Sequence, residues 1–222
     1  MLTRLNDGYA GDKLSGKSLL IEKASLNAMT QKAILATLEK NHFSKGKIKI
    51  VLSFHSFMRY LAVIYFEVAG KENVDKTLEL VKRMAEEHGT KNVIVASITG
   101  FTARKAFEVF KDMDVTLTVV GTERNRFSTD LQRKLEEEGH HVCFSREVSY
   151  LYPDLVKLAF RRFSEGVKVA VEVGMIAAQK RFVSTEEDVI CVGKWDTALI
   201  IKPATSDNFS ELKVRELICM PR

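Results

Sequence analysis

Apolar, β-rich runs alternate with amphipathic segments from residue 59 onward, and this alternation restricts the fold more than any other feature of the chain. Few polar residues interrupt the runs, and short connections separate them from the amphipathic segments. Strands of this kind are buried on both faces, which is typical of a mostly parallel sheet covered by helices. The sequence therefore predicts an α/β protein. Its expected strands are 59–66, 92–96, 115–120, 141–144, 188–193, 197–203 and 214–220.

The segments between these runs carry helix signals. Asn73 can accept a hydrogen bond from a free backbone N–H, and Gly89 can close the helix that follows. A second helix is expected at 102–111, and the capping-box spacing of 129–132 predicts the start of a third. Periodicity leaves 167–181 open, because its alternating valines favour a strand whereas its length and alanine-rich end favour a helix.

The chain divides into two unequal parts, a basic N-terminal extension at 1–57 and an α/β domain at 58–222. The extension holds nine of the 34 Lys and Arg residues and four of the 29 acids, which leaves 25 of each charge for the domain. It is either a helical arm, a poorly ordered leader or translated upstream sequence, since Met58 directly precedes the first convincing strand. Its aromatic residues are too scattered for a stacking platform, so we do not expect it to bind nucleic acid.

The cellular compartment follows from what the sequence contains. No apolar run approaches the roughly 20 residues that span a bilayer, and the N-terminus lacks the features of a secretory signal. The cysteines are odd in number and far apart, which suits reduced, buried thiols better than disulfides or a zinc site. We therefore expect a cytoplasmic protein with no membrane partner. The three cysteines are Cys143, Cys191 and Cys219.

A group of hydroxyl residues around Gly100 marks the point where a predicted strand becomes a predicted helix. The first four N–H groups of a helix have no partner within it and carry the positive end of the helix dipole, so they favour an anion. Ser97, Thr99 and Thr102 can each donate to a phosphate oxygen, and the basic pair at 104–105 can balance its charge. In an open α/β sheet, such loops lie at the carboxyl ends of the strands, where ligands bind.

Two interpretations of this loop stay open at the level of sequence. In the first, Thr99 or Thr102 only caps the helix, which stabilises it by about 1 kcal/mol. In the second, the loop holds a phosphate group. The loop is not a P-loop, because the G-x-x-x-x-G-K spacing is missing.

Five stretches of the chain resemble one protein family. The family is an uncharacterised archaeal and bacterial set built like the C-terminal α/β domain of pyruvate kinase, and the resemblance covers about residues 63–222. The opening Y-F-E-x-x-G-K-E-N and the D-T-A-L-x-I-K-P-A run are its specific motifs. The stretches are the run from IYFEVAGKEN to TARKA, EGVKVAVEVGMIAA, EEDVICVG, DTALIIKPA and LKVRELICMPR.

The resemblance implies a fold and a site. The fold is a three-layer α/β/α sandwich whose mostly parallel sheet ends in an antiparallel strand, with 167–181 as a buried helix. The site takes a phosphorylated ligand, with flavin mononucleotide (FMN) or a sugar phosphate as candidates. By position, the phosphate-binding role passes to Ser97, Thr99, Gly100, Phe101 and Thr102, and the residues that close the site are Asp196 and Thr197.

The chain also departs from the family pattern. GTERNRF stands where relatives carry a His-rich stretch with Gly and Phe, and SREVSYLYP is shorter than its counterpart. VGKWDTA replaces a glycine-rich loop, and Trp195 within it either stacks on a flat ring or fills the space. Arg124 and Arg126 either bind phosphate or belong to a solvated loop, and the second interpretation is favoured.

No set of side chains with catalytic or metal-binding spacing emerges from the sequence. His140 and His141 are adjacent on a predicted strand and therefore point apart. The leading hypothesis is a binding module for a phosphorylated small molecule. The alternatives are a flavin-dependent redox enzyme and a structural or oligomerising domain with a vestigial pocket, and self-association is compatible with each of the three.

Overall fold

The computed structural model describes residues 63–222, so the basic extension and the first four residues of the predicted strand 59–66 lie outside the described part. A seven-stranded sheet runs through this part in the order β1-β7-β6-β5-β2-β3-β4, and every pairing is parallel except the two that involve β6. The strands are β1 (Ile64–Phe66), β2 (Asn92–Ala96), β3 (Thr116–Gly121), β4 (His141–Phe144), β5 (Val189–Val192), β6 (Ala198–Lys202) and β7 (Lys213–Pro221).

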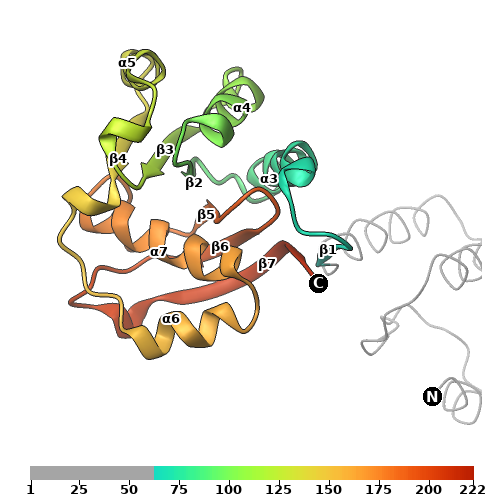
Figure 1. Cartoon of the computed structure of the whole chain (residues 1–222), viewed down its shortest axis with the longest axis vertical. Helices are drawn as coiled ribbons and strands as arrows, with labels where there is room; N and C mark the ends of the chain where they lie inside the picture. The colour runs from blue at the N-terminus through green and yellow to red at the C-terminus, as the bar shows by residue number, and fades with distance from the viewer. Residues whose placement is uncertain (1–62) are drawn as a thin grey trace, which may run out of the picture. The chain divides into compact units, whose positions relative to one another are not determined.

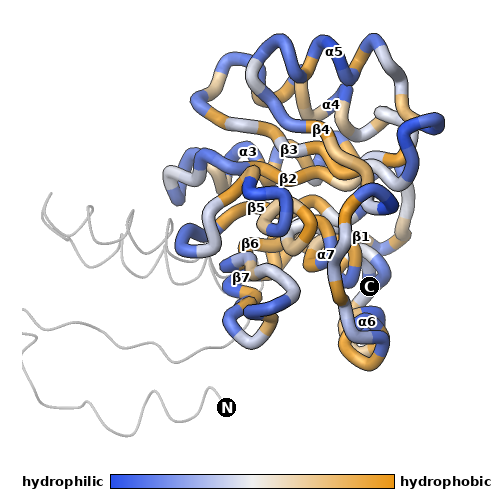
Figure 2. Tube along the Cα trace, turned by 90° about the vertical axis from the view of Figure 1, so that its left-hand side faces the viewer, coloured by the Kyte–Doolittle hydropathy of each residue, from blue (hydrophilic) through white to orange (hydrophobic). Residues whose placement is uncertain are grey.

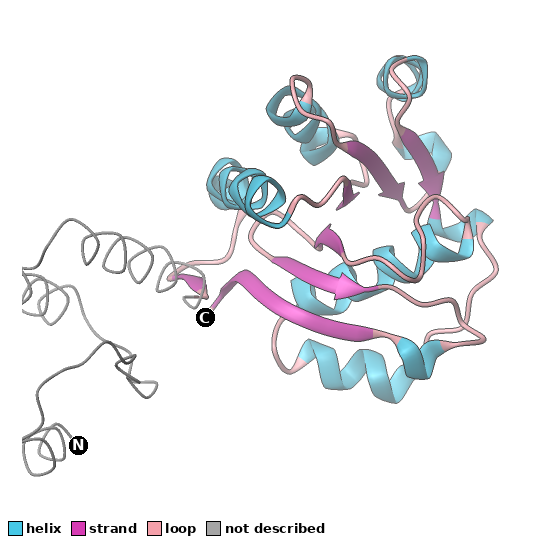
Figure 3. Ribbon diagram, turned by 180° about the vertical axis from the view of Figure 1, so that it is seen from behind, coloured by secondary structure: helices cyan, strands magenta, loops and turns pink. Residues whose placement is uncertain are grey.

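Helices cover both faces of the sheet and make three layers (Figures 1 and 3). One face is covered by α3 (Val74–His88), α4 (Phe101–Phe110) and α5 (Thr129–Glu137), and the other by α7 (Glu165–Gln179). A short helix, α6 (Asp154–Arg161), packs against α7 on its outer side. Four 3₁₀ turns complete the description: Lys71–Asn73, Arg124–Arg126, Ser145–Glu147 and Phe209–Glu211.

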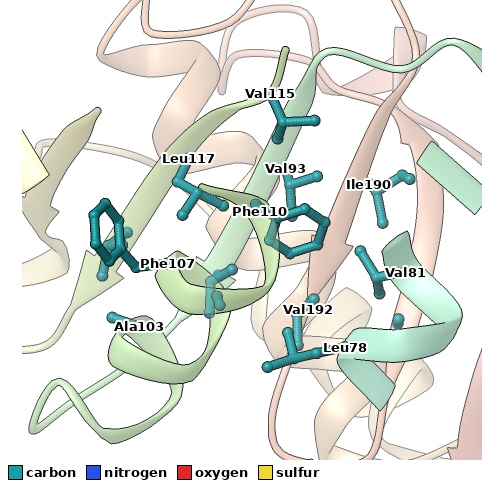
Figure 4. Close-up of a cluster of buried hydrophobic side chains, with 14 of the residues drawn as sticks. Leu78, Val81, Val93, Ala103, Phe107, Phe110, Val115, Leu117, Ile190 and Val192 are labelled. Carbon is teal, nitrogen blue, oxygen red and sulfur yellow. The ribbon is translucent and has the colours of Figure 1, made fainter. Parts of the chain in front are cut away.

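Two apolar cores lie on opposite faces of the sheet because neighbouring strand residues point to opposite sides. On β2, Val93 and Val95 face the α3–α4 layer, whereas Ile94 faces α7. Figure 4 shows Val93 within the first core, where Phe110 of α4 and Leu78 of α3 pack against the strands. The continuous apolar runs in the sequence thus correspond to strands buried on both faces.

The predicted α/β class and the three-layer sandwich are confirmed, and most expected elements agree with the structure to within one or two residues. Residues 167–181, which periodicity could not assign, belong to α7. The antiparallel strand, however, is not at the end of the sheet: β6 lies between β5 and β7, both of which run the other way. After the reversal at β6, β7 runs in the same direction as β5 and pairs parallel with β1.

The expected caps of α3 and α5 were wrong. Asn73 precedes α3, but its side chain accepts no capping hydrogen bond, and its amide donates instead to the Val68 carbonyl at 2.7 Å. The N-cap of α5 is Ser128, whose hydroxyl accepts a hydrogen bond from the N–H of Leu131 at 3.4 Å. Ser128 has the extended backbone that an N-cap requires, whereas Thr129 is already the first helical residue.

The three cysteines are unpaired and buried in the sheet. Burial raises the pKa of the Cys143 thiol to about 11 and that of the Cys219 thiol to about 12. Within residues 63–222, none of the helices has the length and apolar character needed to cross a bilayer.

Candidate functional site

Two loops meet at the carboxyl edge of the sheet because β2 and β5 are parallel neighbours, with Val95 in register with Val192. The first loop, Ser97–Gly100, leads from β2 into α4. The second, Gly193–Thr197, turns from β5 into β6. Residues about 95 positions apart in the sequence are therefore brought together by strand order. Both expected parts of the site, 97–102 and 196–197, lie at this edge.

The cap of α4 is the side chain of Ser97. Its hydroxyl oxygen accepts a hydrogen bond from the backbone N–H of Ala103 at 3.2 Å, and the Arg104 N–H bonds to the Gly100 carbonyl at 2.9 Å. Gly100 has a φ of 87°, a conformation that favours glycine because other residues acquire a steric clash with Cβ. The capping role expected for Thr99 or Thr102 thus belongs to a residue at the end of the strand.

Three backbone N–H groups at the start of α4, those of Gly100, Phe101 and Thr102, have no protein acceptor within the described residues. Thr99 is exposed and the Phe101 ring is partly so, with 40% of the residue accessible, whereas Ser97, Gly100 and Thr102 are buried. Of the three expected hydroxyls, that of Thr99 is therefore the one presented to solvent.

Asp196 and Thr197 point into the protein. The Oδ2 atom of Asp196 accepts a hydrogen bond from the backbone N–H of Gly70 at 3.0 Å, and its Oδ1 accepts one from the Thr197 hydroxyl at 3.2 Å. Both residues are buried, and the Thr197 side chain packs against Gly166 in the first turn of α7. These two residues therefore position the β5–β6 loop, and neither is exposed to a ligand.

A row of alternating cations and aromatic rings borders the start of α4. Lys71 lies between two rings, with its Nζ 5.6 Å from the centre of the Phe101 ring and 5.4 Å from that of Trp195. Lys105 extends the row beyond Phe101 at 5.7 Å, and Lys194 extends it beyond Trp195 at 5.1 Å. These distances are within the range of cation–π attraction. The row physically connects the two loops of the site.

The row leaves positive charge unmatched. Lys105 forms an ion pair with Asp75 at 2.6 Å. Within residues 63–222, Lys71 and Lys194 have no carboxylate partner. Together with the free N–H groups of α4, these two ammonium groups make the exposed part of the site electropositive.

Lys71 was not identified as a site residue from the sequence, although it lies within the G-K-E-N stretch that supports the family resemblance. The one signal for Lys71 in the sequence was its position, because it is a basic residue shortly after the first predicted strand. The spacing to Trp195 could not be read from the chain, since 124 positions separate Lys71 and Trp195. Trp195 itself is half-buried and packs against the core, so it fills space while leaving a ring face to the lysines.

A second polar cluster lies on the opposite face of the sheet. The carboxylate of Glu172 on α7 accepts hydrogen bonds from the Tyr150 hydroxyl and from the Lys168 ammonium group, each at 2.6 Å. Burial, and then the hydrogen bond to Glu172, raises the pKa of Tyr150. The Glu172 carboxylate is thus held by two side chains. The cluster attaches the segment before α6 to α7.

Of the remaining candidates from the sequence, Arg124, His140 and His141 have structural partners, whereas Arg126 is exposed in the turn that follows β3. Arg124 forms a bidentate ion pair with Glu147, with N–O distances of 2.7 and 3.1 Å. His140 packs edge-on against Phe107, and His141 stacks on Phe182 on the other side of the sheet. In the part of the chain that the structure describes, His, Cys, Asp and Glu form no group of three that could hold a metal ion.

The fold and this edge define an α/β sandwich with an electropositive loop site. No family model matches the chain. Part of it is similar to a crystal structure of Cryptosporidium parvum pyruvate kinase, with 16% identity, a TM-score of 0.33, and coverage of 60% of this chain and 22% of that one. Another crystal structure, of a pyruvate kinase from the same organism, gives 13% identity, a TM-score of 0.33, and coverage of 68% and 23%. The chain thus matches less than a quarter of the length of either enzyme.

Proposed function

We propose that this protein is a cytoplasmic binding module for a phosphorylated small molecule, held where α4 begins. The observation that carries the proposal is the position of Lys71. Its ammonium group lies between the Phe101 and Trp195 rings, has no carboxylate partner in the described residues, and borders a helix terminus with free N–H groups. A phosphate group would complement both the ammonium charge and the helix dipole.

The burial pattern specifies how such a ligand would bind. The phosphate would approach from the exposed side of the site, which is formed by Ile98 and Thr99 of the loop and by Phe101 at the start of α4. Ser97 and Asp196 would support the loop without touching the ligand, because each is buried and already hydrogen-bonded. The aromatic rings can stack on a planar group. FMN is therefore one candidate, because its flavin ring could stack on these side chains. The other candidate is a sugar phosphate, whose phosphate group would bind the lysines without any stacking.

The family resemblance of the sequence is consistent with this proposal. We propose that the chain is a member of the archaeal and bacterial family built like the C-terminal domain of pyruvate kinase. Binding is the activity that we infer for this site, because its exposed part carries ammonium groups and aromatic rings, whereas the hydrogen-bonded side chains of Ser97 and Asp196 are buried. A flavin-dependent reaction would use the same site, with the chemistry supplied by the flavin.

Calorimetric titration of the full chain with FMN, a hexose bisphosphate and inorganic phosphate tests the proposal. We expect at least one of the first two to bind with a Kd below about 1 mM. Lys71→Ala should weaken that binding about tenfold, which corresponds to roughly 1.5 kcal/mol for a hydrogen bond to a charged group.

Lys213→Ala is the matched control, since this lysine is exposed on β7 and belongs to neither loop of the site. It should leave the affinity unchanged. Absence of binding by all three compounds, or equal losses in the two variants, would overturn the proposal. Comparing the affinity for FMN with that for the hexose bisphosphate also shows whether binding depends on stacking against the rings or on recognition of phosphate alone.

A further inference from the structure

The ion pair between Lys105 and Asp75 joins α4 to α3 beside the proposed phosphate site. The Nζ atom of Lys105 lies 2.6 Å from Oδ1 of Asp75. The two helices pack against one another over the same face of the sheet, whose strands are largely hydrophobic (Figure 2), so the pair lies on the outer side of this layer. The Asp75 side chain is 74% exposed and that of Lys105 is 34% exposed. Water therefore reaches both partners, and a pair of this kind contributes little to stability.

The ammonium group of Lys105 also borders the start of α4. Lys105 lies one turn after Phe101, and helical side chains lean towards the N-terminus of their helix. Its Nζ is accordingly 5.7 Å from the centre of the Phe101 ring, and the Nζ of Lys71 is 5.6 Å from the same centre. Two ammonium groups thus border one exposed ring. They differ because Lys105 has a carboxylate partner, whereas Lys71 has none within residues 63–222.

A phosphate group at the start of α4 would compete with Asp75 for Lys105. A phosphate monoester carries about two negative charges at neutral pH and forms strong, charge-assisted hydrogen bonds with ammonium groups. The exposed pair with Asp75 costs little to break. Exchange of the carboxylate for the phosphate therefore leaves the ammonium group paired and is favoured by the larger charge of the phosphate.

We propose that Lys105 is a further phosphate-binding lysine of this site, and that Asp75 limits the affinity by holding the Lys105 ammonium group in the free protein. Ligand binding transfers that group from the Asp75 carboxylate to the phosphate. Asp75 thus sets the affinity without touching the ligand. The inference rests on the proposed function, since both concern a phosphate bound at the start of α4.

Calorimetric titration of the full chain with FMN and with a hexose bisphosphate tests the inference. Asp75→Asn keeps the size of the side chain and removes its charge, so the Kd of the compound that binds the parent should fall about threefold to fivefold. Lys105→Met should raise the Kd by a similar factor, because it removes the ammonium group. Damage to the fold does not tighten binding, so the Asp75→Asn result distinguishes this role from a structural one. An unchanged or raised Kd for Asp75→Asn would overturn the inference.

The pair between Lys91 and Asp114 supplies the matched control. It has the same N–O distance of 2.6 Å and lies at the opposite edge of the sheet, where β2 and β3 begin. Asp114→Asn removes the same charge and should leave the Kd unchanged. An equal gain in affinity for the two asparagine variants would show that net charge alone governs binding, which excludes a specific role for Asp75.

The double variant with Asp75→Asn and Lys105→Met tests whether Asp75 acts through Lys105. Once Lys105 is absent, Asp75→Asn should change the Kd by less than about twofold, since it has no ammonium group to release. A full gain in that background would assign the effect to charge repulsion and contradict the transfer. The proposed function fails in a different way, because the parent chain then binds neither compound. Binding by the parent without the expected differences among the variants overturns only the inference about Lys105.

Discussion

The backbone N–H of Gly70 donates a hydrogen bond to the Oδ2 atom of Asp196 at 3.0 Å, and this bond joins two loops that lie 126 residues apart in the sequence. Lys71 follows the donor and Trp195 precedes the acceptor. The bond therefore sets the distance between the ammonium group and the ring that borders the proposed phosphate site. A partly buried hydrogen bond thus positions the exposed ammonium group of Lys71 and the half-buried ring of Trp195.

Replacing Asp196 should destabilise the fold. Asp196→Ala leaves the partly buried Gly70 N–H without its acceptor and removes the buried Asp196 carboxylate, so we expect the free energy of unfolding to fall by about 1–2 kcal/mol. Asp196→Asn should lose less, because an amide oxygen can still accept from Gly70. Urea unfolding monitored by circular dichroism measures both. Asp207→Ala serves as the control at an exposed acid, and an equal loss there would contradict the assignment.

Substitutions at two glycines with left-handed backbones distinguish the cost of backbone strain from the cost of steric overlap with neighbouring side chains. Gly89 has a φ of 64° and open space around an added Cβ, so Gly89→Ala should cost about 1 kcal/mol from strain alone. Gly100 has a φ of 87°, and an added Cβ would lie 2.8 Å from Cδ2 of Leu131. Gly100→Ala should therefore cost more than Gly89→Ala and should also weaken ligand binding, because α4 begins there. Equal unfolding free energies for the two variants would contradict this account.

The stability of the fold should be more sensitive to loss of the largely buried Lys168–Glu172 pair on α7 than to loss of a surface pair. Glu172→Ala leaves the Lys168 ammonium group and the Tyr150 hydroxyl without their common acceptor, so we expect a loss of about 3 kcal/mol. Tyr150→Phe removes one hydrogen bond and should cost roughly 1.5 kcal/mol. The exposed pair of Lys76 and Glu79 supplies the control, since Glu79→Ala should change stability by no more than about 0.5 kcal/mol. Chemical unfolding of the three variants checks the order.

His140 should make stability depend on pH. Burial lowers the pKa of its imidazole below the ordinary histidine value of about 6.5, and the Nδ1 atom accepts a hydrogen bond from the Leu117 N–H at 3.2 Å. The unfolded chain therefore takes up the proton first, so stability is full above about pH 6.5 and declines as the pH falls towards the folded-state pKa. His140→Asn should flatten this decline in unfolding free energy. A decline that is flattened instead by His141→Asn would assign it to the neighbouring imidazole.

Local patterns in the sequence determined the class of fold. Strands buried on both faces must be apolar at nearly every position, so β2, β3 and β5 were visible as continuous runs. Amphipathic helices such as α3 were visible because one face must be apolar, and Gly89 ended it as expected. The α7 helix was harder to predict, since a helix packed between the sheet and α6 is apolar on most of its surface.

The sequence by itself thus determined that this chain forms an α/β sheet with a hydroxyl-rich loop where a helix begins, because those features depend on neighbouring residues. Only the tertiary structure decided which residues occupy the site. Ser97 and Asp196 are engaged inside the protein, whereas Lys71 lies between Phe101 and Trp195 at the surface. The order of the strands decides these contacts, since it brings together residues that no local rule connects.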